Sequence, residues 1–133
     1  MTAMVEDWLH KLSPDEWIAA AMGELRRAEA AYGRSDARAG LAGCKRAAGM
    51  ALNGALIVEP SAAWGRTYVE HVAALAREEK IPEAVRAACK VILEARPPSS
   101  DLLSLRSKAG DERVLEATRD VIAHAYAVVK RHA

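Results

Sequence analysis

Residues 36–57 are apolar on two sides of the helix that they would form, and few folds can accommodate such a helix. One stripe holds Leu41, Cys44, Ala48, Ala51, Leu52, Ala55 and Leu56, and a second holds Gly40, Gly43, Ala47, Met50 and Gly54. At 100° per residue the two stripes lie about 120° apart around the axis. We therefore predict a central helix that is contacted on two sides. Each interior glycine costs about 1 kcal/mol against alanine, so the three glycines indicate a close approach by a neighbouring helix, by a second copy of the chain or by a ligand.

Prolines, glycines and capping residues divide the rest of the chain into amphipathic helices. Ser13-Pro14-Asp15-Glu16 has the pattern of a capping box with proline at the first helical position, and apolar residues then recur at helical spacing to Tyr32. Ser35 is the predicted cap of the central helix. Further helices are predicted at 68–79, from Pro82 to the stop at Arg96-Pro97, and at 111–131, with a lid helix at 2–12, a turn at 101–105 and a loop at 107–110. We expect an all-α fold, a compact bundle of five helices plus one or two short helices, in a single domain of residues 1–133.

Charge and cysteine usage narrow the classes of function. The chain has 19 basic and 18 acidic side chains, so a nucleic-acid partner would need a local basic patch. Cys44 and Cys89 fall on apolar stripes and are interpreted as buried reduced thiols. The chain has no CxxC motif or Cys/His cluster, so we predict neither a metal site nor a cofactor. We expect a cytoplasmic protein without a membrane span, because no apolar run approaches the roughly 20 residues that one needs.

The last predicted helix carries the stretch Arg119-Asp120-Val121-Ile122-Ala123-His124-Ala125-Tyr126. This stretch resembles the signature of HEPN-domain proteins, in which an arginine and a polar residue are followed by a short spacer and a histidine. Tyr126 matches the longer form of the motif in ribonuclease toxins that pair with minimal nucleotidyltransferase antitoxins. In the central helix, Gly49 and Asn53 stand where the family often shows a glutamate and a lysine. The resemblance is therefore close over eight residues and loose over about half the chain.

The resemblance implies a helical bundle, often a homodimer, whose active members cleave RNA without a metal. It implies that Arg119 and His124 serve phosphate binding and RNA cleavage, and that the partners include RNA or a nucleotide and a nucleotidyltransferase antitoxin. The chemistry fits, because histidine titrates near neutral pH and arginine offers a permanent charge to phosphate. Asp120 lies four residues before His124 and could orient its ring, while Tyr126 could line the same surface as Arg119.

Helix geometry opposes a site within one chain. Arg119 and His124 project about 140° apart on a straight helix, so a second copy is the easiest way to bring them together. Lys45 and Arg46, with Arg34 and Arg38 nearby, form a small patch that either contacts phosphate or only solubilises the surface. Our first hypothesis is thus a HEPN-like bundle that binds nucleotide or RNA, with or without ribonuclease activity.

Two other interpretations of the sequence stay open. The main rival is a non-catalytic protein-interaction module that docks through the small-residue face or the lid helix, and a bundle that binds an apolar ligand is a third. His71 is interpreted as a histidine at the edge of the core. Trp8, Trp17 and Trp64 are interpreted as core and lid residues rather than as a stacking site for a ligand.

Overall fold

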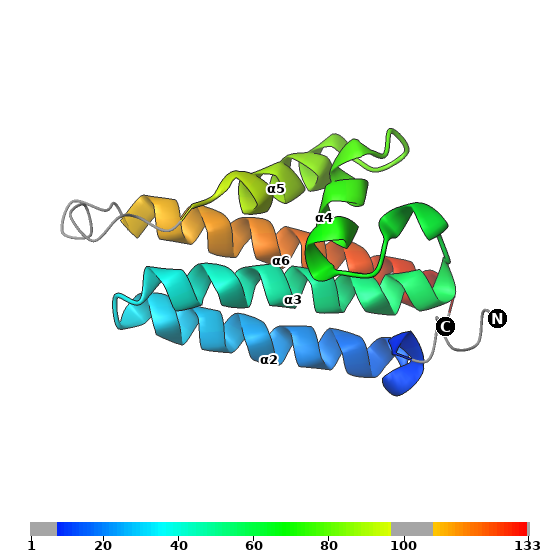
Figure 1. Ribbon diagram of the computed structural model, residues 1–133, viewed down its shortest axis with the longest axis horizontal. Coiled ribbons are helices and arrows are strands. Elements are labelled where there is room, and N and C mark those ends of the chain that lie inside the picture. Colours follow the sequence, from blue (N-terminus) through cyan, green and yellow to red (C-terminus); the bar gives the residue numbers. More distant parts are fainter. Residues whose placement is uncertain (1–7, 97–107, 133) are drawn as a thin grey trace.

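The computed structural model describes residues 8–96 and 108–132 of the chain. Within these ranges the chain forms five α-helices, two short 3-10 helices and no strand. The elements are η1 (Leu9–Lys11), α2 (Pro14–Gly33), α3 (Ala37–Val58), η2 (Ala62–Trp64), α4 (Tyr68–Arg77), α5 (Glu83–Glu94) and α6 (Lys108–Arg131). The predicted all-α bundle of five helices with one or two short ones is confirmed (Figure 1).

The start of the chain is attached to α2 by one buried hydrogen bond. Of the lid helix predicted at 2–12, residues 2–7 lie outside the described residues, and the remainder contains only the 3-10 turn η1. The Trp17 Nε1–H donates to the carbonyl oxygen of Leu9 at 2.7 Å, which holds η1 against α2. The turn predicted at 101–105 also lies outside the described residues.

Side-chain caps determine where three of the helices begin. The predicted capping box of α2 is confirmed, since the Glu16 backbone N–H donates to Ser13 Oγ at 3.1 Å and the Ser13 N–H donates to Glu16 Oε1 at 2.9 Å. A second capping box joins Thr67 and Glu70 at the start of α4. The prediction of Ser35 as the cap of the central helix is wrong, because Asp36 Oδ1 accepts from the backbone N–H of Ala39 at 3.1 Å.

Three other predicted boundaries move by a few residues. Helix α6 begins at Lys108, so the loop predicted over 107–110 is wrong for its last three residues. The single glycine there, Gly110, costs about 1 kcal/mol and does not stop the helix. Pro82 has an extended ψ of 141° and is the N-cap of α5 rather than its first helical residue. Helix α4 ends at Arg77, short of the predicted Glu79.

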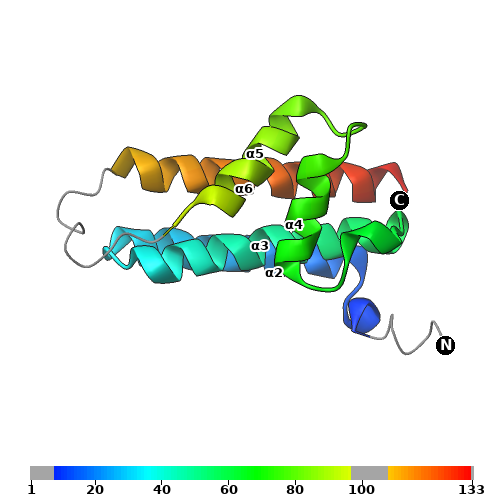
Figure 2. The same ribbon diagram turned by 45° about the horizontal axis from the view of Figure 1, so that its top comes forward.

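The three long helices α2, α3 and α6 lie side by side, α4 packs against α3, and α5 packs mainly against α6 (Figures 1 and 2). Helix α3 contacts α2, α4, α5 and α6, which confirms that it is central. A Cβ added at Gly43 would lie 3.1 Å from the Ala28 Cβ, and one added at Gly54 would lie 2.9 Å from the Pro14 carbonyl oxygen. The glycine stripe is therefore covered by α2 of the same chain. This face is therefore closed to the predicted homodimer, which would have to use another surface such as α6.

The core is filled by side chains that the helical patterns select. Every member of the predicted α6 stripe is buried, from Val114 and Leu115 to Val128 and Val129. Cys44 and Cys89 are buried and free, as predicted. None of the helices in the described ranges has the length and apolar character needed to cross a membrane.

Candidate functional site

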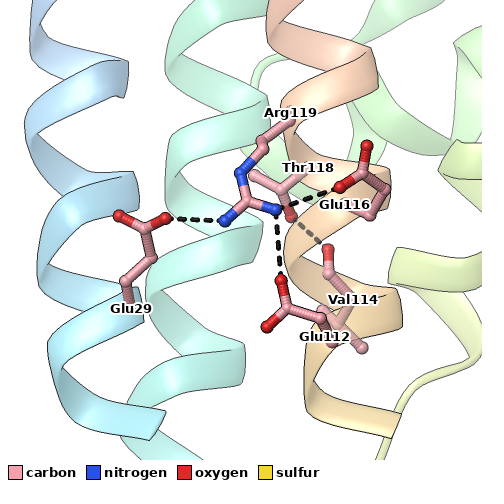
Figure 3. Close-up of polar contacts among 6 residues, drawn as sticks. All are labelled: Glu29, Glu112, Val114, Glu116, Thr118 and Arg119. Atoms are coloured by element: carbon pink, nitrogen blue, oxygen red, sulfur yellow. Dashed lines mark hydrogen bonds and ion pairs between the residues drawn. The ribbon is translucent and has the colours of Figure 1, made fainter. Parts of the chain in front are cut away.

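Arg119, the first residue of the predicted motif, is surrounded by three carboxylates (Figure 3). Its Nη2 lies 2.7 Å from an oxygen of Glu29 on α2, and its Nη1 lies 3.4 Å from Glu112 and 3.1 Å from Glu116 on α6. The hydrogen bond to Glu29, followed by those to the other two glutamates, raises the pKa of Arg119 although burial opposes this. Three negative charges around one positive charge leave this surface acidic. It would repel an RNA phosphate rather than attract one.

His124, the second residue of the motif, lies on another side of α6. It is half-buried and lines a pocket of about 260 Å³ at the end of the bundle. Burial lowers the pKa of His124, the charge of Arg131 lowers it further, and Glu59 and Glu78 oppose the shift. The ring is therefore neutral at neutral pH. Glu29 binds Arg119 on the α2 side of α6 while His124 lines this pocket, so one chain does not bring the two residues together.

The other predicted site residues do not complete a catalytic group. Asp120 is exposed, and within the described ranges no hydrogen bond joins it to His124. The Tyr126 side chain is 48% exposed, and its ring centroid lies 5.3 Å from the Lys130 ammonium nitrogen. Tyr126 therefore points toward solvent.

The predicted basic patch on α3 is partly neutralised. Arg46 Nε donates to Glu24 at 3.2 Å, and the same carboxylate accepts from Arg27 at 2.8 Å. Lys45 is partly buried. Glu24 therefore offsets part of the positive charge of this patch, and the patch remains net positive.

The pocket beside His124 is formed near the C-terminal ends of three helices, α3, α4 and α6. Its lining comprises Ala55 and Glu59 from the end of α3, Pro60, Ser61 and Trp64 from the connection to α4, Glu78 and Ile81 after α4, and His124, Val128 and Arg131 from α6. Glu59 accepts hydrogen bonds from Arg131 Nη2 at 3.0 Å and from His132 Nε2 at 2.8 Å. The pocket thus combines an apolar wall with two carboxylates, an imidazole and a guanidinium.

A comparison with models of known protein families, with curated proteins and with solved structures finds no match for this chain.

A buried histidine supports the wall of the pocket. His71 is fully buried, and its Nδ1–H donates to the Trp64 carbonyl oxygen at 2.9 Å. Burial lowers the pKa of His71, so the ring is neutral and Nε2 carries a lone pair. Asn53 Oδ1 lies 2.8 Å from Nε2, and both atoms are acceptors. The amide must therefore be turned over so that Nδ2, which has no other partner among the described residues, donates to Nε2. The rings of Trp8 and Trp64 lie 6.2 Å and 6.1 Å from His71, so this group belongs to the core.

The pocket offers one serine hydroxyl, that of Ser61, and Cys44 and Cys89 lie in the core. Among the residues that the structure describes, no hydrogen bond joins His124 to Ser61, and no group of three His, Cys, Asp or Glu side chains could hold a metal ion. Burial raises the pKa of both Cys44 and Cys89, that of Cys89 to about 12, so both thiols are protonated at neutral pH.

Sequence reasoning missed the pocket because its lining comes from segments far apart in the chain. Among the residues that line the pocket, only His124 was predicted from the sequence to be a site residue. Glu59 and Glu78 each follow the last residue of a helix, a position that invites no functional interpretation from sequence alone.

Proposed function

We propose that this protein is a non-catalytic binding module, and that the pocket beside His124 takes its ligand. The observation that carries the proposal is the state of Arg119, whose guanidinium binds Glu29, Glu112 and Glu116 while His124 lies in a separate pocket. The motif residues therefore serve two different purposes. Arg119 joins α6 to α2, and His124 lines the binding site.

A ribonuclease would require two changes to this arrangement. A second copy of the chain would have to bring its Arg119 to His124, and that Arg119 would have to leave its three carboxylates. RNA or nucleotide binding through Lys45 and Arg46 would further require Glu24 to release Arg46. Each of these changes breaks ion pairs of Arg119 or Arg46 that remain intact when the protein acts as a binding module.

The proposed module works inside the cell. Both cysteines are free and buried, which fits a reducing compartment such as the cytoplasm. A homodimer or a protein partner is compatible with the proposal, because the pocket is open at the end of the bundle. Neither is needed to complete its lining.

Nuclease assays test the negative half of the proposal. We expect the purified chain, in EDTA, to leave single-stranded RNA intact, and His124→Ala and Arg119→Ala to behave in the same way. RNA cleavage by the wild type that both substitutions reduce by about a hundredfold or more, with unchanged circular dichroism, would overturn the proposal in favour of a ribonuclease.

Ligand screening tests the positive half. Small amines, alcohols and carboxylates are added to the protein one at a time, and amide NMR spectra are recorded. A ligand of the pocket should shift the signals of residues that line it. Ser61→Tyr places a large ring at the pocket lining and should abolish these perturbations. Ala63→Tyr is the matched control, because Ala63 is exposed two residues away and does not line the pocket. Binding that Ser61→Tyr leaves intact would refute the assignment of the pocket.

A further inference from the structure

We propose that the ligand of this pocket is an organic cation, a protonated amine or guanidinium attached to a short apolar group. The inference rests on the proposed function, since it assumes that the pocket is the binding site. It adds the chemical class of the ligand, which follows from the charges, the helix ends and the size of the pocket.

The charged groups of the pocket leave one carboxylate without a counter-ion. Arg131 and Glu59 are bound to each other at 3.0 Å, so their charges offset one another. The Glu78 side chain is partly buried and makes no ion pair or hydrogen bond with any described residue. His124 is neutral at neutral pH and adds a lone pair but no charge. The pocket therefore has one net negative charge, which a cation would balance.

The helix ends around the pocket also favour a positively charged ligand. Helix α3 ends at Val58 and α4 ends at Arg77, so Glu59 and Glu78 occupy the two C-cap positions. The C-terminal end of a helix carries about half a negative charge, and a cation there is stabilising while a carboxylate is not. At the end of α3, Arg131 supplies a positive charge to Glu59, and His132 supplies a further hydrogen bond. At the end of α4, Arg77 is exposed and forms no ion pair with Glu78, so that position is open for a cation from outside.

The size and walls of the pocket limit the ligand to a small one. Its volume of about 260 Å³ is below the roughly 300–1,000 Å³ typical of sites for drug-sized ligands, which a nucleotide would need. Trp64, Ile81 and Val128 provide apolar surface beside the carboxylate. A free amine of a few carbon atoms fits this description, and so does a lysine or arginine side chain from another protein. Both sources present the same chemistry to Glu78.

Three ligands of one shape and different charge test the inference on the full chain. Benzylamine, benzyl alcohol and benzoate share a benzyl or phenyl group and carry positive, zero and negative charge. We expect benzylamine to shift the amide NMR signals of Glu78, Ile81 and His124, with at least about tenfold weaker binding of the other two. Glu78→Gln should weaken benzylamine binding by roughly tenfold to a hundredfold, because a charge-assisted hydrogen bond is lost. Glu79→Gln removes the same charge from an exposed neighbour outside the pocket and should leave the affinity within about twofold.

Each outcome separates the inference from the proposed function. Benzoate or benzyl alcohol binding as tightly as benzylamine, at a site that Ser61→Tyr blocks, would overturn the cation and leave the binding pocket standing. Failure of all three ligands to bind would overturn the pocket as a ligand site. A lysine blocked at both backbone ends distinguishes the two sources. Binding as tight as that of benzylamine favours a protein side chain as the ligand, and its failure favours a small free amine.

Discussion

Replacing Gly49 by alanine measures how closely α4 approaches the central helix. Gly49 is buried in α3, and a Cβ built there would fall within 3.0 Å of both Cβ and Cγ of Tyr68, the first residue of α4. These are the atoms nearest the backbone of Tyr68, so rotation of its side chain cannot remove the conflict. The start of α4 must move away from α3, together with the Thr67–Glu70 capping box that fixes it.

Two opposing effects set the size of the expected change. Overpacking of a well-packed core costs typically 1–3 kcal/mol and occasionally more, and a contact with rigid atoms places this site at the upper end or above it. Alanine recovers about 1 kcal/mol of helix propensity. We expect a net loss of about 2 kcal/mol in the free energy of unfolding, which lowers Tm by roughly 7 °C for a chain of this length.

Thermal and urea unfolding followed by circular dichroism would measure the loss. Gly23→Ala is the matched control, because Gly23 lies inside α2 and its added Cβ would meet no atom within 4 Å. It should raise the free energy of unfolding by about 0.5–1 kcal/mol. The same substitution should thus change stability in opposite directions in two helices. Equal stabilisation by both would refute the close contact between α3 and α4.

Two other predictions concern the core. Leu115→Ala or Ile122→Ala should cost about 2–5 kcal/mol in urea unfolding, since both side chains are buried on α6, and a loss under about 0.5 kcal/mol for both would mean that α6 is not packed as described. Burial lowers the pKa of His71 below 6.5, so below about pH 6.5 the unfolded chain binds a proton that the folded chain does not. As the pH is lowered from about 6.5 to the folded-state pKa of His71, the free energy of unfolding should therefore decrease. His71→Gln should reduce the change of the unfolding free energy with pH. His124→Gln measures the contribution of the other histidine whose pKa is lowered. An unchanged pH dependence in His71→Gln would show that His71 is not held neutral in the core.

Features that depend on a few consecutive residues could be predicted from the sequence. The Ser13–Glu16 capping box and the α6 core stripe were predicted correctly, because each follows from local hydrogen bonding or from the helical period. The Thr67–Glu70 box has the same sequence pattern and was missed. Ser35 and Asp36 are both good capping residues, and only the positive φ of 64° at Ser35 decides between them.

Features that depend on distant residues could not be predicted. Glu29 is 90 residues away from Arg119 in the sequence, and no local pattern shows that it occupies the guanidinium. The motif therefore suggested a free arginine where the structure has a charge cluster. His124 was singled out from the sequence as a catalytic residue, and in the structure it lines a pocket whose other residues Glu59 and Glu78 come from the ends of two other helices.

Helix α3 has a consequence for how the chain folds. It contains four interior glycines, at positions 40, 43, 49 and 54, each costing about 1 kcal/mol relative to alanine. As an isolated peptide α3 would therefore be largely unstructured, because short helices are marginal in water even with good helix formers. The helix at the centre of the bundle becomes stable only when α2, α4 and α6 pack against it. We infer that the bundle folds as one cooperative unit, in which no part containing α3 persists without its neighbours.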